Sequence, residues 1–173
     1  MDSSGRPVHP TAPSRYLGLD PGLNRTGYAL VERSAAGPKL LEGGVLRSST
    51  SDSLARRVHE LGRGLREVLD EHKPDAVAIE QVFSMVRNPK TAILMAHARG
   101  ALLMTVVEFG APIIHYTPAQ IKKLLTGSGR ASKEQIQNAV KAELKLKKLL
   151  EPNDVADASA IALCLYHGVR FAA

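Results

Sequence analysis

The order of strand and helix patterns along the chain is the feature that most limits its fold. Three strand patterns follow one another through short turns, at residues 16–20, 26–32 and 40–47. Turns of this length favour antiparallel pairing. Two later strand patterns, at residues 75–80 and 111–116, flank a long helical pattern at residues 90–108, which predicts parallel pairing through a right-handed crossover. The sequence therefore predicts an α/β fold with a mixed five-stranded sheet, three strands antiparallel and then two parallel.

Helical patterns account for most of the remaining chain. Residues 54–69 carry apolar side chains at spacings of three and four, which places them along one helix face. Ser51 or Asp52 is the expected N-cap of this helix. Further helices are expected to begin near Pro118, Ser132 and Asn153, where a proline or a capping residue suits a first turn. The prediction is a sheet with helices on both faces.

The first 15 residues differ from the rest of the chain. They hold three prolines among Ser and Thr and show no apolar period, so we expect a disordered leader at residues 1–15 and one domain at residues 16–173. They lack the apolar stretch of a secretory signal, and no uninterrupted apolar run approaches the ~18 residues of a membrane span. A cytosolic protein without a membrane partner is expected. The single cysteine, Cys164, excludes an internal disulfide and a cysteine-based zinc site.

Basic residues are concentrated in the second half of the chain. The formal net charge is +6, yet residues 87–148 alone hold eleven Lys and Arg against three Glu, so the remainder is slightly acidic. A basic segment of this kind indicates a polyanionic partner, with nucleic acid the first candidate. Charge alone leaves open the alternative of a solvated surface without a ligand.

Four carboxylates stand where a predicted core element ends. Asp20 and Glu80 each close a buried strand, and Asp154 and Asp157 share one face at the start of the last helix. Each acid also has a purely structural interpretation. Asp20 fits a turn before Pro-Gly, Glu80 a strand end that reaches solvent, and Asp154 a charge favoured by the helix dipole. The four together favour a common site.

Converging carboxylates repel one another unless cations are present. Hard divalent ions with oxygen ligands meet this need, and two Mg²⁺ ions would balance four carboxylates. Paired divalent ions beside a basic surface indicate phosphodiester chemistry, in which one ion activates the attacking water and the other stabilises the leaving 3′ oxygen. The basic segment would hold the substrate backbone.

The same residues carry a resemblance to a known family. In order and spacing the chain resembles RuvC, the bacterial Holliday-junction resolvases of ribonuclease H-like fold, through three blocks: Leu19-Asp20-Pro21-Gly22 with Thr26-Gly27-Tyr28, Ile79-Glu80-Gln81-Val82-Phe83, and Asp154-Val155-Ala156-Asp157-Ala158. The Glu-Gln-Val-Phe block is the specific part, since an isolated Asp-x-Gly is common. The resemblance runs from Tyr16 to about His167.

The resemblance implies a homodimer that nicks two opposed strands of a four-way DNA junction symmetrically, in recombination and repair. It also implies partner proteins of the RuvA and RuvB type and a bacterial cytoplasmic, nucleoid-associated location. The catalytic and metal-binding set it implies, for two Mg²⁺ ions with Mn²⁺ as the alternative, is Asp20, Glu80, Asp154 and Asp157.

The resemblance also implies a set of DNA-binding residues. Lys122 and Lys133 would lie near the scissile phosphate and the backbone. Phe83 would stack on a base at the opened crossover, although an ordinary core aromatic is the alternative. Arg87 and Lys90, in the basic segment, are further candidates for DNA binding.

Several alternatives stay open at this point. The helix at residues 90–108 is apolar nearly all round, which fits either a buried helix or a dimer interface. A YqgF-type resolvase or RNA-processing nuclease has the same fold, but a Glu-Gln-Val-Phe block with two acids in the final helix is not expected there. An ATP-binding domain of the actin and sugar-kinase type needs two such domains. A junction-binding protein without catalysis would not need all four acids.

Overall fold

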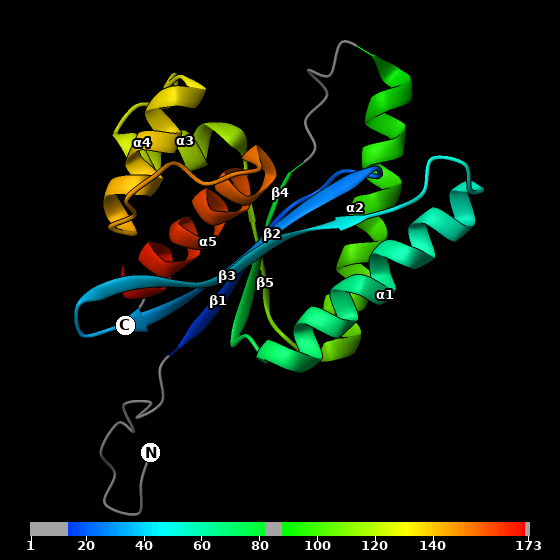
Figure 1. Ribbon diagram of the computed structural model, residues 1–173, viewed down its shortest axis with the longest axis horizontal. Coiled ribbons are helices and arrows are strands. Elements are labelled where there is room, and N and C mark those ends of the chain that lie inside the picture. Colours follow the sequence, from blue (N-terminus) through cyan, green and yellow to red (C-terminus); the bar gives the residue numbers. More distant parts are fainter. Residues whose placement is uncertain (1–13, 82–87, 172–173) are drawn as a thin grey trace, which may run out of the picture.

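The computed structural model describes residues 14–81 and 88–171 (Figure 1). These residues form five strands: β1 (Arg15–Asp20), β2 (Arg25–Ser34), β3 (Gly37–Arg47), β4 (Ala76–Glu80) and β5 (Ile113–Tyr116). They also form five helices: α1 (Leu54–His72), α2 (Pro89–Phe109), α3 (Pro118–Thr126), α4 (Lys133–Glu143) and α5 (Asn153–Phe171).

The strands form one mixed sheet in the order β3-β2-β1-β4-β5. β2 pairs antiparallel with both β1 and β3, and β4 pairs parallel with both β1 and β5. Figure 1 shows α1 and α2 against one face of the sheet and α3, α4 and α5 against the other. The predicted mixed α/β sheet with helices on both faces is therefore confirmed.

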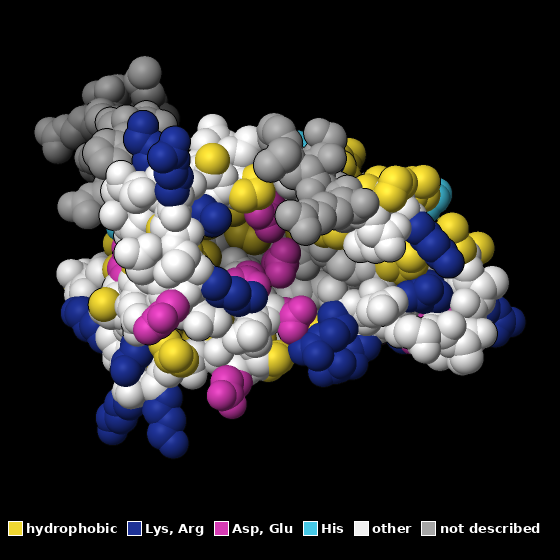
Figure 2. Space-filling view, turned by 90° about the horizontal axis from the view of Figure 1, so that it is seen from above, with side chains coloured by type: hydrophobic (Ala, Val, Ile, Leu, Met, Phe, Trp, Pro, Cys, Tyr) yellow, Lys and Arg dark blue, Asp and Glu magenta, His cyan; other side chains and the backbone are white. Residues whose placement is uncertain are grey.

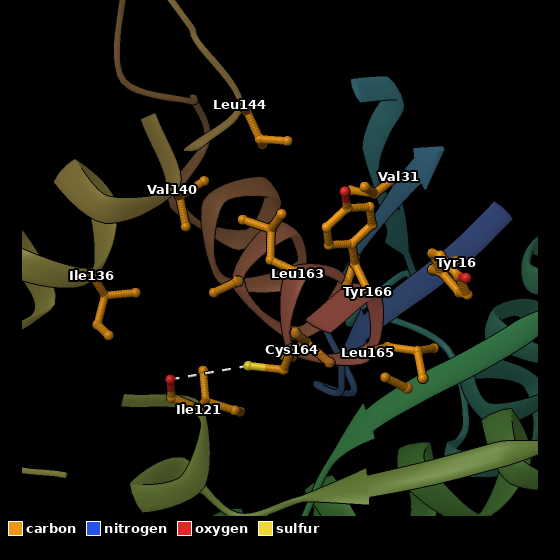
Figure 3. Close-up of a cluster of buried hydrophobic side chains, with 14 of the residues drawn as sticks. Tyr16, Val31, Ile121, Ile136, Val140, Leu144, Leu163, Cys164, Leu165 and Tyr166 are labelled. Carbon is orange, nitrogen blue, oxygen red and sulfur yellow. Dashed lines mark hydrogen bonds between the residues drawn. The ribbon is translucent and has the colours of Figure 1, made fainter. Parts of the chain in front are cut away.

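The two faces of the central strands pack against different helices. Leu19 of β1 and Ile79 of β4 belong to a buried cluster with α1 and α2. Ala78 of β4 belongs to a second cluster, built around α5, α3 and α4 (Figure 3). Because side chains alternate between the faces of a strand, Asp20 and Glu80, which follow Leu19 and Ile79, lie on the α5 face.

Two glycines let α5 approach the sheet closely. A Cβ added to Gly18 of β1 would lie 2.2 Å from the carbonyl oxygen of Ala158, and one added to Gly27 of β2 would lie 2.2 Å from that of Asp154. No side chain fits at either place, so any larger residue would push the helix away. This contact fixes where the first turns of α5 meet the ends of the strands.

The boundaries of some elements differ from those predicted. β1 begins at Arg15, whose backbone N–H donates to Asp75 at 2.7 Å, so this residue belongs to the sheet and not to the leader. Residues 1–13 of the expected leader lie outside the described residues. The N-cap of α1 is Ser53, which has extended backbone angles and accepts from the Arg56 N–H, so the prediction of Ser51 or Asp52 was wrong.

The apolar helix α2 is only partly covered. Ala98, Leu102, Thr105 and Val106 are buried against the rest of the domain, whereas the following side chains are exposed: Ile93, Met104 and Val107. By length and a mean hydropathy of 1.4, α2 is also the one described helix that could cross a membrane, although buried core helices pass the same test. Polar residues interrupt its apolar run, which is why the sequence alone did not predict a span.

Candidate active site

The two strand acids stand side by side at one end of the sheet. β1 and β4 are parallel neighbours, with Leu19 opposite Ile79, and Asp20 and Glu80 end these strands. Both side chains lie on the face that α5 covers. The period-two pattern of two separate strands thus brings together two carboxylates that are 60 positions apart in the chain.

A cavity of about 240 Å³ opens at this end of the sheet. Its polar lining comes from β1, β4, α3, α4 and α5, and consists of Asp20, Glu80, Lys122, Lys133 and Asp157. In the view of Figure 2, Asp and Glu side chains lie around a hollow near the middle of the face, with Lys and Arg side chains on both sides. The cavity is large enough for several water molecules or a hydrated cation.

The two acids of α5 are each paired with a basic side chain. Lys133 Nζ, at the first position of α4, lies 3.0 Å from Asp157 Oδ2. Arg25 Nη2, at the start of β2, lies 2.6 Å from Asp154 Oδ2. Asp154 does not line the 240 Å³ cavity, but its charge still acts on Asp20. The structure therefore brings three of the four predicted acids into one cavity and places the fourth beside it.

The strand acids are held in an environment that disfavours their charged forms. Burial, with the negative charges of Glu80, Asp157 and Asp154, raises the pKa of Asp20 to about 8, although Lys133 acts to lower it. Burial and then the charge of Asp157 raise the pKa of Glu80, while a hydrogen bond with Asp20 and the charge of Lys122 act in the opposite direction. Without a bound cation, this pair therefore retains a proton at neutral pH.

These residues fit a hard divalent cation. Among the described residues, no three His, Cys, Asp or Glu side chains are arranged as a ready-made metal site, and Arg25 and Lys133 contact two of the four acids. The donors are nevertheless carboxylate oxygens, which Mg²⁺ prefers. Burial, and then the charges of the neighbouring acids, raise the pKa values of Asp20 and Glu80, and a bound cation would favour the ionised form of both.

The predicted DNA-binding residues fall into three groups. Lys122 of α3 and Lys133 of α4 line the cavity beside the acids. Lys90, in the first turn of α2, is exposed and does not line it. Phe83 and Arg87 lie outside the described residues. The DNA-binding role of all five residues stays a prediction.

Arg99 of α2 belongs to the basic segment, but no specific contact was predicted for it. Its Nε–H donates to the backbone carbonyl of Glu80 at 3.1 Å, and its Nη2 lies 2.6 Å from Nδ1 of His115 on β5. Burial and the charge of Arg99 both lower the pKa of His115, so the neutral ring accepts from the guanidinium. Arg99 thus ties the end of β4 to α2 and β5. Its signals in the sequence are its place in the basic segment, its position within an apolar helix, and the resemblance of Ala98-Arg99-Gly100 to the family.

Arg25 is the second residue that the sequence analysis missed. It stands outside the basic segment at residues 87–148, and its contact with Asp154 joins positions 129 residues apart. The only available signal was its place in a short turn next to the strand that follows Asp20.

Comparisons with known proteins agree with this geometry. The family model for "Crossover junction endodeoxyribonuclease RuvC" matches residues 16–165. A protein of that description from Rhodopirellula baltica is 50% identical over 157 residues, covering 91% of this chain and 88% of the relative.

Solved structures of the same family are also similar to this chain. The structure of RuvC from Thermus thermophilus superposes with a TM-score of 0.85 at 34% identity, covering 91% of this chain and 96% of that one. A second structure shows the Thermus protein in complex with a Holliday junction substrate, with the same TM-score and identity and coverages of 92% and 96%.

Proposed function

The chain belongs to the RuvC family of crossover junction endodeoxyribonucleases, and we propose that it resolves four-way DNA junctions by nicking two opposed strands. The observation that carries this proposal is the cavity in which Asp20, Glu80 and Asp157 face Lys122 and Lys133. Carboxylates suited to hard cations thus lie beside lysines suited to phosphates. We expect the protein to act in the bacterial cytoplasm, at the nucleoid.

The acids are the expected ligands of two Mg²⁺ ions, with Mn²⁺ as the alternative. Such ions supply an activated water and stabilise the leaving 3′ oxygen of the cleaved strand. Asp20 and Glu80 would hold them from fixed positions at the strand ends, and Asp157 and Asp154 from the first turns of α5. Asp20 must lose its proton for this role, and a cation favours the ionised carboxylate.

The basic residues are the expected DNA contacts. Lys122 and Lys133 would bind the strand at the scissile phosphate, because their ammonium groups line the same cavity as the acids. Phe83 would stack on an unpaired base, and Arg87 and Lys90 would bind the backbone near the crossover. Partners of the RuvA and RuvB type remain expected from the family alone.

We also propose that α2 pairs with the same helix of a second copy. Its exposed Ile93, Met104 and Val107 are 58%, 61% and 68% accessible, and beside them a groove runs between α1 and α2. An apolar surface of this kind marks an interaction site. Two copies would place two active sites on one junction, which symmetric nicking requires.

The dimer is tested by a charge on this surface. Val107→Asp should convert a dimer into a monomer in analytical ultracentrifugation. The matched control, Leu149→Asp, changes an exposed leucine of the α4–α5 connection, 44% accessible, and should leave the dimer intact. Equal dimer stability in both variants would exclude α2 as the interface.

The activity is tested with three substrates: a synthetic four-way junction, a linear duplex and an RNA–DNA hybrid. Each is incubated with Mg²⁺, with Mn²⁺ and with EDTA. Paired symmetric nicks in the junction alone, only when a metal is present, are the expected result. Preferential cleavage of the hybrid would instead support an RNA-processing nuclease, and cleavage in EDTA would exclude the metal-dependent mechanism.

A further inference from the structure

Three arginines from outside the basic segment gather at one end of the β2–β3 ladder, and one of them, Arg25, contacts Asp154. Arg25 at the start of β2 and Arg47 at the end of β3 are direct partners in the antiparallel ladder. Arg57, in the first turn of α1, reaches the same end of the hairpin, where its Nε–H donates to Ser48 Oγ at 3.2 Å and its Nη2 contacts Asn24. We call these three residues the arginine face: Arg25, Arg47 and Arg57.

The arginine face carries more positive charge than its surroundings neutralise. Like charges directly opposite each other on neighbouring strands are unfavourable, as Arg25 and Arg47 are here. Among the described residues, the ion pair of Arg25 with Asp154 is the only one that any of the three forms. The polar contacts of Arg57 are with neutral side chains. Such a cluster therefore favours an anion from outside the chain.

The acid that neutralises Arg25 is also an expected metal ligand. If Asp154 binds a cation, its charge is no longer available to Arg25, and the arginine face becomes more positive. Binding of metal and binding of an anion at Arg25 would thus support each other, because Arg25 and the cation compete for one carboxylate.

The arginine face and the cavity lysines approach the acids from different elements. Lys122 and Lys133 come from α3 and α4, whereas the arginine face comes from the β2–β3 hairpin and α1. Figure 2 shows basic side chains on both sides of the acidic hollow. A strand that crosses the acids between two such surfaces would be held both before and after the cleaved bond.

We propose that the arginine face binds the phosphodiester backbone of the junction on the side of the acids away from Lys122 and Lys133. The inference rests on the proposed function, since it names a second contact surface for the same substrate. Arginine suits this role because its planar guanidinium donates two parallel hydrogen bonds to a phosphate.

The test is the salt dependence of junction binding, measured in EDTA so that no cleavage occurs. Variants Arg47→Gln and Arg25→Gln/Arg47→Gln are compared with Lys39→Gln. Lys39 is exposed on the same strand as Arg47, about 25 Å away along β3. The control thus removes the same charge from the other end of the strand.

Each lost phosphate contact should reduce the slope of log affinity against log salt by about 1. Because Asp154 still pairs with Arg25 when no metal is bound, we expect a reduction of about 1 for Arg47→Gln and a further reduction of less than about 1 for the double variant, with several-fold weaker binding at ~0.1 M salt. Lys39→Gln should keep the wild-type slope, and Arg25→Lys/Arg47→Lys should restore most of it. Circular dichroism and thermal unfolding would establish that each variant is folded.

The outcomes separate this inference from the proposed function. If the wild-type chain binds and nicks the junction but the arginine variants keep its salt slope, only the arginine face is wrong. If Lys39→Gln loses as much as Arg47→Gln, the effect is one of total charge and the inference also fails. If the wild-type chain neither binds nor cuts a junction, the proposed function itself is wrong.

Discussion

The negative charges of the acids at the strand ends and of the acids on α5 are compensated in different ways. Asp20 and Glu80 form no ion pair among the described residues, and burial raises the pKa of both. The side chains of Asp154 and Asp157 are 26% and 32% accessible, and each contacts a basic side chain from a distant element, Arg25 or Lys133. The site thus combines two carboxylates without an ion pair with two that each form one, of which Asp157 lines the cavity and Asp154 lies beside it.

The difference follows from the elements that carry the acids. The strand acids are fixed by the parallel ladder of β1 and β4, so they cannot move apart to relieve their repulsion. The helix acids stand in the first turns of α5, where long arginine and lysine side chains can reach them. We infer that the strand acids need a bound metal ion to stay ionised. At the helix acids, a metal ion can replace the arginine or lysine that each acid contacts.

The largest expected effect comes from removing one strand acid. Asp20→Asn should lower the rate of junction cleavage by about 10³-fold or more, since a neutral amide is a poor ligand for Mg²⁺. Junction binding should stay within about threefold of wild type, because basic residues make the backbone contacts. Cleavage under single-turnover conditions and binding in EDTA measure the two quantities.

The control for this variant is Asp75→Asn, at the opposite end of β4. Asp75 accepts the backbone N–H of Arg15 at 2.7 Å, and an asparagine side chain can still accept it. This variant should cleave at the wild-type rate. A near-normal rate for Asp20→Asn would show that the strand acids do not hold the catalytic metal.

The second prediction moves the helix acids and leaves the strand acids in place. In Gly27→Ala the new Cβ would lie 2.2 Å from the carbonyl oxygen of Asp154, so the start of α5 must shift. We expect a loss of about 3 kcal/mol in the free energy of unfolding, measured in urea, and slower cleavage in the folded fraction. Gly129→Ala, whose nearest neighbour lies at 3.6 Å, should change stability by less than about 1 kcal/mol. Equal stability of the two variants would show that α5 is not held by this contact.

The third prediction concerns pH and tests the missing counter-ion of Asp20. Its pKa is about 8 in the folded chain against 3.8 for the ordinary carboxyl. Between these values folding takes up a proton, so the free energy of unfolding should fall as pH rises, by at most about 1.4 kcal/mol per pH unit. The contribution is complete below about pH 4 and is lost as pH rises through about 8.

The asparagine variant isolates this contribution. In EDTA, Asp20→Asn should be more stable than wild type, with the difference growing from pH 5 to pH 8 because asparagine has no proton to lose. Urea unfolding at several pH values measures it. A constant difference across this range would mean that Asp20 ionises normally and that the strand pair needs no cation.

Both halves of the site could be predicted from the sequence only in part. The pattern places Asp20 and Glu80 each at the end of a buried strand. The strand–helix–strand order predicted that β4 and β5 are parallel, but it did not reveal that β1 pairs with β4, because β2, β3 and α1 lie between them in the chain. The spacing of three puts Asp154 and Asp157 on one helix face. That spacing does not give the rotation of α5 against the sheet, so it did not reveal that Asp154 lies outside the cavity.

Contacts of long side chains between distant elements were beyond the sequence. Arg25 reaches Asp154 and Arg99 reaches the carbonyl of Glu80 only because the fold brings these segments together. The exposure of α2 is a similar case, because one apolar pattern fits both a buried helix and an interface. Period and spacing report the face on which a residue lies, but not the element that covers that face.

The smallest expected effect tests whether the ion pairs of the helix acids are as weak as their solvent exposure indicates. Lys133 and Asp157 are 57% and 32% accessible, so breaking this pair by Lys133→Gln should cost less than about 1 kcal/mol of unfolding free energy. The exposed pair of Arg63 and Glu67 on α1 provides the reference, and Arg63→Gln should have a similar cost. Urea unfolding in EDTA at neutral pH compares the two variants.

A loss of about 3 kcal/mol or more for Lys133→Gln, with Arg63→Gln near zero, would mean that Lys133 is a fixed part of the site. The Lys133–Asp157 ion pair would then be a fixed contact, and a metal ion could not easily displace the lysine.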